Sequence, residues 1–164
     1  MSDEEKKATE LKKTNDPLAA RKARRENRFK IDRETAVDEF EELCYQFGIN
    51  YETQYMNDEN KEGFETQKEL IIFAIRDGRL SVNDNGTLNF VVSNTPEKNG
   101  DVLIVKRPKG ECYTRLNEQK KKDTVKQSFA LLAAMIDKSV GYIMTLDGID
   151  LKPLQAVEVL FTVG

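Results

Sequence analysis

Few side chains in this sequence can act as nucleophiles or metal ligands. The chain contains two cysteines, Cys44 and Cys112, and no histidine. Histidine is the most common general base and metal ligand in proteins, and a structural zinc site needs about four cysteine or histidine ligands. Because the cysteines also lack CxxC spacing, we predict two free thiols in a reducing compartment, with Cys44 as a small buried side chain.

Carboxylates are abundant, but their spacing is typical of solvated surfaces and helix caps. Adjacent acidic residues occur in stretches that we expect to be exposed, at Asp38-Glu39, Glu41-Glu42 and Asp58-Glu59. Asp147 and Asp150 lie on either side of Gly148 as in a fragment of a calcium loop, but the remaining positions of an EF-hand are missing. We therefore predict no catalytic residue, no metal site and no cofactor, and we expect Asp150 to cap the last helix.

A basic run near the N-terminus is the one feature with an obvious ligand. Residues 1–33 hold 11 basic and 7 acidic side chains, whereas residues 34–164 hold 15 basic and 22 acidic ones. The candidate contact residues are Arg21, Lys22, Arg24, Arg25 and Arg28. They could neutralise phosphates in a salt-sensitive way, although no interleaved aromatics are present for base stacking. Docking onto an acidic protein surface and simple solubility remain open.

The apolar residues divide the chain into a leader and a folded body. Residues 1–33 contain too few large apolar side chains to form a core, which predicts a flexible or conditionally helical leader. Asp16 and Pro17 favour a helix start within it. Residues 34–164 are predicted to form a single domain. Its subregions, 34–95 and 96–164, would meet at a turn-rich boundary and share one core.

Apolar residues recur at helical spacing in four stretches of the body. These stretches are residues 32–47, 65–77, 122–138 and 150–161. Gly48 stands where the first of these helices would end. In the third helix the predicted core-facing stripe consists of Val125, Phe129, Leu132 and Ile136.

Short β-rich runs predict an antiparallel sheet of three or four strands. The runs are residues 80–82, 88–92, 102–105 and 113–116. Asn85-Gly86, between the first two runs, favours a hairpin because both residues tolerate positive φ. The polar stretch 50–61 predicts a loop whose tyrosines, Tyr51 and Tyr55, fold back on the core. The whole pattern predicts an α+β fold with about four helices packed on a small antiparallel sheet.

The hydropathy pattern argues against export and membrane insertion. No apolar run approaches the roughly 18–20 residues of a membrane-spanning helix. The N-terminal residues mix acidic and basic side chains and lack the apolar region of a secretory signal. We therefore expect a cytoplasmic protein with no membrane partner.

The last 64 residues carry a sequence pattern that is similar to a known family. The strand-and-turn stretch 102–110, with Pro108 in its turn, precedes an amphipathic helix at 122–138. The break at 146–150 then leads into a closing helix that ends near Phe161. This pattern resembles the tail assembly chaperones and related small tail proteins of tailed bacteriophages. The resemblance covers residues 101–164.

The resemblance implies a protein that binds the long helical tape measure protein before the tail tube polymerises. Such a partner exposes apolar helical surface that would aggregate in water. An apolar groove between helices of this chain could bind and shield that surface. The residues that we expect to contact the partner are Leu131, Met135, Leu154 and Phe161. The alternative that all four belong to the core remains open.

Two other functions remain open at the level of sequence. The chain could be a structural subunit of a virion or tail, in which case it would be found in the finished particle rather than only in the host cytoplasm. It could also be a nucleic-acid-associated accessory protein that acts through its basic leader. Self-association into a homo-oligomer is compatible with each of these functions.

Overall fold

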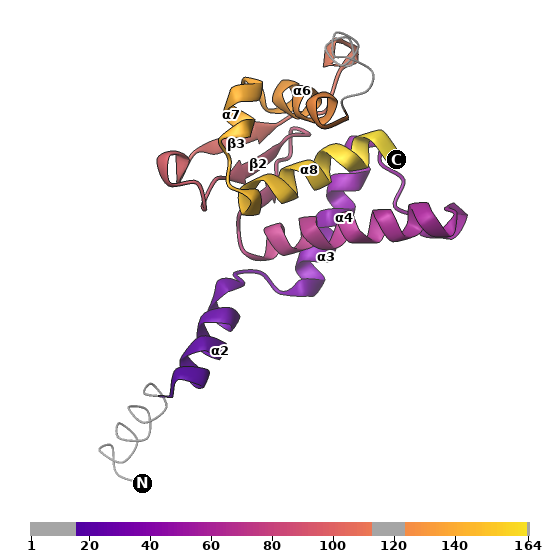
Figure 1. Cartoon of the computed structure of the whole chain (residues 1–164). Helices are drawn as coiled ribbons and strands as arrows, with labels where there is room; N and C mark the ends of the chain where they lie inside the picture. The colour runs from indigo at the N-terminus through magenta and orange to yellow at the C-terminus, as the bar shows by residue number, and fades with distance from the viewer. Residues whose placement is uncertain (1–15, 113–123, 164) are drawn as a thin grey trace, which may run out of the picture. The chain divides into compact units, whose positions relative to one another are not determined.

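The structure is a computed structural model that describes residues 16–112 and 124–163 (Figure 1). The chain divides into two compact units, residues 1–30 and residues 31–164. The second unit combines helices with a three-stranded antiparallel sheet. This architecture confirms the predicted α+β class.

The described part of the first unit is dominated by helix α2 (Pro17–Arg28). The Asp16 carboxylate accepts a hydrogen bond from the Leu18 N–H at 3.0 Å, and Pro17 occupies the first helical position. Both features are those that the sequence predicts for a helix start, because proline has no N–H to lose there.

Five α-helices are described in the second unit. They are α3 (Arg33–Phe47), α4 (Asp58–Arg76), α6 (Thr124–Ile136), α7 (Val140–Met144) and α8 (Gly148–Val163). The four predicted helices correspond to α3, α4, α6 and α8, whereas α7 was not predicted. Gly48 ends α3 with a φ of 65°, a left-handed conformation that favours glycine.

Helix α4 begins earlier than its apolar pattern predicts. The Asn57 side chain accepts the Asn60 N–H at 2.8 Å, so the helix starts at Asp58 inside the predicted loop 50–61. Tyr55, in the short 3₁₀ turn Thr53–Tyr55, is 80% exposed. The expectation that Tyr55 folds back on the core is therefore wrong.

The sheet has the strand order β1-β2-β3. Its strands are β1 (Leu80–Val82), β2 (Leu88–Val91) and β3 (Val102–Val105), each antiparallel to its neighbour. In the predicted hairpin the Gly86 N–H donates to the Asn83 carbonyl, and the Asn83 N–H donates to the Thr87 carbonyl. Only Gly86 of this turn has positive φ, as in a type I turn closed by a left-handed glycine. The predicted strand 113–116 lies outside the described residues.

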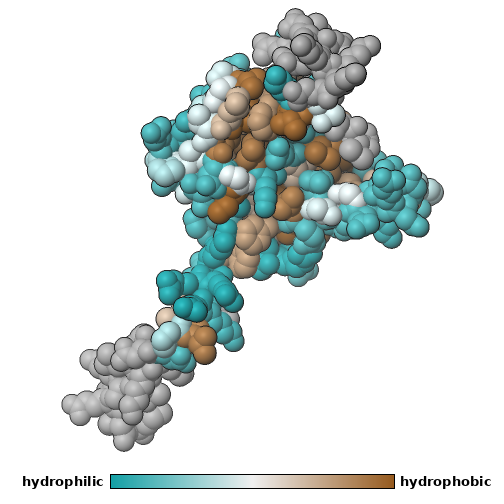
Figure 2. All heavy atoms as spheres, viewed as in Figure 1, coloured by the Kyte–Doolittle hydropathy of each residue, from teal (hydrophilic) through white to brown (hydrophobic). Residues whose placement is uncertain are grey.

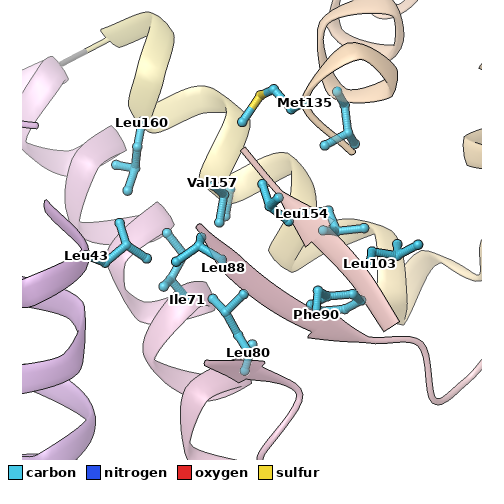
Figure 3. Close-up of a cluster of buried hydrophobic side chains, with 14 of the residues drawn as sticks. Leu43, Ile71, Leu80, Leu88, Phe90, Leu103, Met135, Leu154, Val157 and Leu160 are labelled. Carbon is cyan, nitrogen blue, oxygen red and sulfur yellow. The ribbon is translucent and has the colours of Figure 1, made fainter. Parts of the chain in front are cut away.

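One apolar core joins the helices to the inner face of the sheet (Figure 3). Leu80, Leu88, Phe90 and Leu103 point from the strands toward Leu154 and Val157 of α8, and Ile71 of α4 and Leu43 of α3 extend the same cluster. Helix α8 contacts both α4 and α6. Full burial of an aliphatic side chain of this size contributes about 1.5–3 kcal/mol. The core therefore spans both predicted subregions.

The buried face of α6 is rotated from the predicted stripe. Leu132 and Ile136 are buried as predicted, but Val125 is 59% exposed and Phe129 is only partly buried. Leu131 and Met135 share the burial instead, because α6 packs on α7, α8 and β3 through that side. Among the described helices, none is long and apolar enough to cross a lipid bilayer.

Candidate functional site

The described cysteine and acidic side chains are not grouped in the way that a metal site requires. Within residues 16–112 and 124–163, no group of three or more cysteine, aspartate or glutamate side chains could hold a metal ion. Both cysteines are free thiols. Cys44 is buried on α3, and burial raises the pKa of its thiol to about 12. A thiol with that pKa is a poor nucleophile, which fits a packing role.

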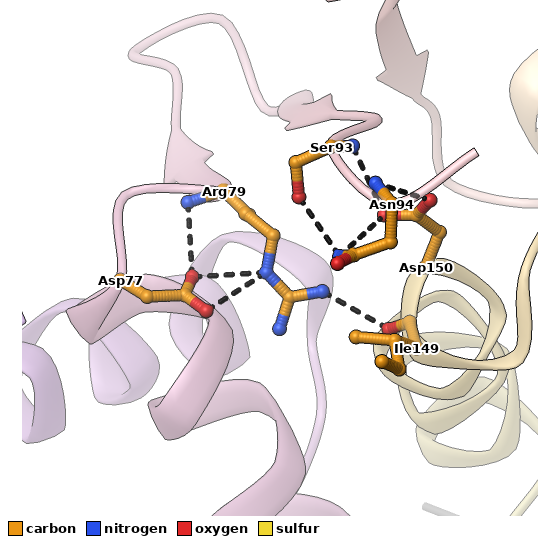
Figure 4. Close-up of polar contacts among 6 residues, drawn as sticks. All are labelled: Asp77, Arg79, Ser93, Asn94, Ile149 and Asp150. Carbon is orange, nitrogen blue, oxygen red and sulfur yellow. Dashed lines mark hydrogen bonds and ion pairs between the residues drawn. The ribbon is translucent and has the colours of Figure 1, made fainter. Parts of the chain in front are cut away.

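The Asp150 carboxylate is a buried anchor for the loop after β2 (Figure 4). It accepts hydrogen bonds from the N–H groups of Ser93 and Asn94 at 3.1 and 2.9 Å. It also accepts one from the Thr95 hydroxyl at 2.8 Å. Burial opposes ionisation of this carboxyl, but these donors outweigh it and lower the pKa of Asp150. With its lone pairs used inside the fold, Asp150 is structural.

The predicted helix cap at Asp150 is wrong, and Asp147 takes that role. The Asp147 carboxylate accepts the Ile149 N–H at 2.8 Å at the start of α8. The Asp147 backbone N–H in turn donates to the Thr95 hydroxyl at 2.8 Å. Either of two aspartates three residues apart could cap a helix N-terminus. Because Asp150 is hydrogen-bonded to the distant loop Ser93–Thr95, Asp147 is the one that caps α8.

A buried arginine completes the polar contacts beside Asp150. The Arg79 guanidinium pairs with the Asp77 carboxylate at 2.9 Å and donates to the Ile149 carbonyl at 3.0 Å (Figure 4). That carbonyl would normally accept the N–H of residue 153, but Pro153 lies inside α8 and has no N–H. Arg79 therefore satisfies a carbonyl that the proline leaves without its helical partner.

Three of the four predicted partner-contacting residues lie in the core. Leu131, Met135 and Leu154 are 0%, 1% and 0% exposed, so they cannot contact a partner in this conformation. Their faces of α6 and α8 pack on each other and on neighbouring elements, which corrects the prediction that these three residues contact a partner. Phe161 is partly buried, and its ring packs edge-on to Phe47 with the centroids 5.2 Å apart.

The predicted basic residues all lie exposed on α2. They are Arg21, Lys22, Arg24, Arg25 and Arg28. The four arginines follow the spacing i, i+3, i+4 and i+7, which places them on one side of the helix. The structure thus places the four arginines on one face of a helix, whereas the sequence shows only that they are close together along the chain.

An apolar groove lies where the first half of α4 meets the end of α8. It has a volume of about 280 Å³. Its lining residues are Met56, Glu59, Asn60, Gly63, Phe64, Gln67, Val159 and Leu160. We call this feature the α4–α8 groove. The close approach of the α8 end to this part of α4 is visible in Figure 1.

The α4–α8 groove combines an apolar floor with a polar rim. Phe64 and Leu160 are buried at its base, and Met56 is partly buried beside them. Glu59 and Asn60 are exposed on the first turn of α4. A few polar groups around an apolar depression are typical of recognition sites.

Gly63 gives the groove an open wall. It lies inside α4, where glycine costs roughly 0.5–1 kcal/mol relative to alanine. A Cβ atom built on Gly63 would meet no heavy atom within 4 Å. No steric requirement of the fold therefore demands glycine at this position, although any side chain there would stand at the groove wall.

A wider depression on α4 combines apolar side chains with charged ones. It has a volume of about 730 Å³. Its lining includes the apolar residues Leu70, Ile72 and Phe73 as well as the charged residues Arg33, Glu62, Glu65, Glu69 and Arg76. Arg33 forms a two-pronged ion pair with Glu69, with nitrogen–oxygen distances of 2.9 and 2.5 Å. The Arg33 hydrogen bond lowers the pKa of Glu69. Because both side chains are about half exposed, this ion pair is solvated and adds little to stability.

Other exposed apolar side chains lie on separate elements. They include Tyr45 on α3, Val102 and Ile104 on β3, Val125 on α6, Met144 on α7 and Ile149 on α8. Figure 2 shows apolar residues over α6 and α7 next to hydrophilic ones. Scattered exposed apolar side chains are normal on folded proteins and do not by themselves mark a site.

Comparisons with known proteins do not assign the chain to a family. No family model, no curated protein and no solved structure matches it. The candidate site therefore rests on the geometry of this chain.

Sequence reasoning missed the residues of the α4–α8 groove. Met56 and Gly63 fall in or next to the stretch that was expected to be a loop. The available signal was Asn57 as a helix cap. A helix that starts after Asn57 contains Gly63 in its interior rather than in a loop. Glycine in that position is unfavourable enough to call for an explanation.

Proposed function

We propose that this chain binds a helical partner protein through the α4–α8 groove. The specific proposal is a tail assembly chaperone of a tailed phage that holds the tape measure protein. The observation that carries the binding proposal is an apolar groove of about 280 Å³ beside a helix-interior glycine. The resemblance of residues 101–164 supplies the identity of the partner.

The lining of the α4–α8 groove suits an apolar side chain from a partner. Met56 is flexible and polarizable, so it can adapt to different shapes. Phe64 provides a flat aromatic surface at the base, and Val159 adds an aliphatic wall. Such a pocket can bury one anchor residue of an amphipathic helix, which is how helix-in-groove recognition gains most of its affinity.

The rim of the groove adds a charge preference. Glu59 lines the groove, and Asp58 and Glu62 are exposed nearby on the same helix. A partner helix with a lysine or arginine next to its apolar anchor would complement these carboxylates. Rim charges of this kind mainly set orientation and the rate of association.

Substitution of Gly63 can distinguish a binding role of the groove wall from a purely structural role. If the open wall served only the fold, alanine or leucine would be the more stable choice. If the wall admits a partner, a side chain at position 63 blocks binding while it stabilises α4. Stability and binding therefore move in opposite directions under the proposal.

The test is co-expression of the tagged full chain with the tape measure protein encoded in the same genome. We expect a complex with the wild-type chain and at least tenfold weaker binding with Gly63→Leu. The matched control is Thr66→Leu, which adds the same side chain to an exposed position on α4 outside the groove. Equal binding by both variants would overturn the groove proposal.

The fate of the chain distinguishes a chaperone from a structural subunit. A chaperone binds the tape measure protein in the host and is absent from purified particles. Stoichiometric recovery of the chain from finished particles would contradict the chaperone proposal and support a subunit.

A further inference from the structure

We propose that α2 binds the phosphate backbone of duplex nucleic acid through an arginine stripe. The stripe consists of Arg21, Arg24, Arg25 and Arg28. This proposal is independent of the α4–α8 groove and of the partner proposed for it. It concerns a sequence-independent contact, because phosphates carry no direct sequence information.

The stripe has the geometry of a continuous contact surface. Residues separated by three, four and seven positions lie on one side of an α-helix. At about 1.5 Å per residue, Arg21 lies about 4.5 Å along the axis from Arg24, Arg25 lies about 4.5 Å from Arg28, and the whole stripe spans about 10 Å. All four side chains are exposed in the structure. One face of a short helix therefore presents four guanidinium groups to a single ligand.

The side-chain chemistry favours phosphate over a protein surface. Leu18 is the one large apolar residue in α2, whereas protein interfaces usually need an apolar core with aromatic anchors. The stripe contains arginine only, and its planar guanidinium binds phosphate oxygens in pairs. Figure 2 shows hydrophilic residues over much of the visible surface of α2.

The form of nucleic acid follows from what α2 lacks. Single-strand binding depends on aromatic side chains that stack on bases, and residues 17–28 contain none. Duplex phosphates form a regular charged array that a basic helix can meet in any sequence. Residues 34–164 carry 22 acidic and 15 basic side chains, so the body adds no net attraction. The contact is therefore assigned to α2.

The test uses the full chain and a fluorescent DNA duplex of arbitrary sequence. We expect binding at 50 mM salt, with a slope of log K against log salt between about −3 and −4. Replacing all four stripe arginines with glutamine should weaken binding at least tenfold and flatten the slope. Glutamine has a helix propensity close to that of arginine, so circular dichroism should show α2 retained.

A charge-matched control separates the stripe from net charge. The control replaces Lys61, Lys106, Lys109 and Lys152, which are exposed in the second unit, with glutamine. This variant should bind DNA within about twofold of wild type. The proposal is overturned if wild type shows no binding at about 100 µM protein, or if both variants lose affinity equally. Stripe-dependent binding to an acidic protein without DNA binding would also overturn it.

Discussion

At the scale of single residues, the buried Asp150 carboxylate links α8 to the loop after β2. Asp150→Asn should lower the free energy of unfolding by about 2–3 kcal/mol at neutral pH. The reason is that an amide nitrogen must face one of the donors from Ser93, Asn94 or Thr95. Urea unfolding measures the change, and an unaltered midpoint would show that these hydrogen bonds add nothing to stability.

The same carboxyl predicts how stability depends on pH. Because the folded state lowers the pKa of Asp150, its contribution is present above the ordinary value of 3.8. The contribution is lost as the pH falls through the lower folded-state pKa. The wild-type advantage over Asp150→Asn should therefore be full at pH 6 and shrink at strongly acidic pH.

Glu158 should behave in the opposite way. Burial raises the pKa of this carboxyl, and the Ser128 hydroxyl, which donates to it at 3.1 Å, only partly offsets that effect. A raised pKa destabilises the folded state as pH rises above the ordinary value of 4.5. Glu158→Gln should therefore raise stability by about 1 kcal/mol at pH 7 and change it little at pH 3. A loss of stability at pH 7 would contradict this account.

Single-residue roles were predictable only where their partners are local. The Asp16 cap of α2 and the buried thiol of Cys44 follow from nearby sequence. The roles of Asp150 and Arg79 depend on groups more than 50 positions away, at Asn94 and Ile149. No short-range pattern carries that information.

At the scale of elements, Arg79 and Pro153 form a coupled pair across the fold. Arg79→Met should cost about 3–5 kcal/mol, because it leaves the Asp77 carboxylate and the Ile149 carbonyl without their partner. Adding Pro153→Ala restores a backbone N–H for the Ile149 carbonyl. The double variant should therefore recover about 1 kcal/mol of the loss in a double-mutant cycle. Additive effects would show that the proline does not create the need for Arg79.

The rotated face of α6 gives a second prediction for an element. Leu132→Ala should cost about 2–5 kcal/mol, because the side chain is fully buried. Val125→Ala should change stability by less than about 0.5 kcal/mol, because Val125 is largely exposed. Melting temperatures of the two variants test this order, and a larger loss at Val125 would restore the stripe predicted from sequence.

Elements were predictable where apolar spacing and end signals agree. Helix α3 has both a clear stripe and Gly48 at its end, and β1 and β2 flank a glycine turn. The first turns of α4 are polar, so periodicity could not reveal them, and the Asn57 cap sets their start. Helix α7 has only five residues, which is too short for a periodic signal.

At the scale of the whole molecule, the α4–α8 groove joins residues about 100 positions apart. Met56 precedes α4, and Val159 lies near the end of α8. Each residue alone looks like ordinary core or loop, and only the packing of α8 on α4 brings them together. A sequence can predict that helices exist, but the surfaces that they create together depend on the tertiary arrangement.

The most direct test of the account measures stability and partner affinity on the same Gly63→Leu sample. We predict an unchanged or higher melting temperature, because leucine is a better helix former than glycine. We predict at the same time at least tenfold weaker binding to the tape measure protein. Undiminished affinity in a stably folded Gly63→Leu chain would contradict the central claim that the α4–α8 groove binds a partner.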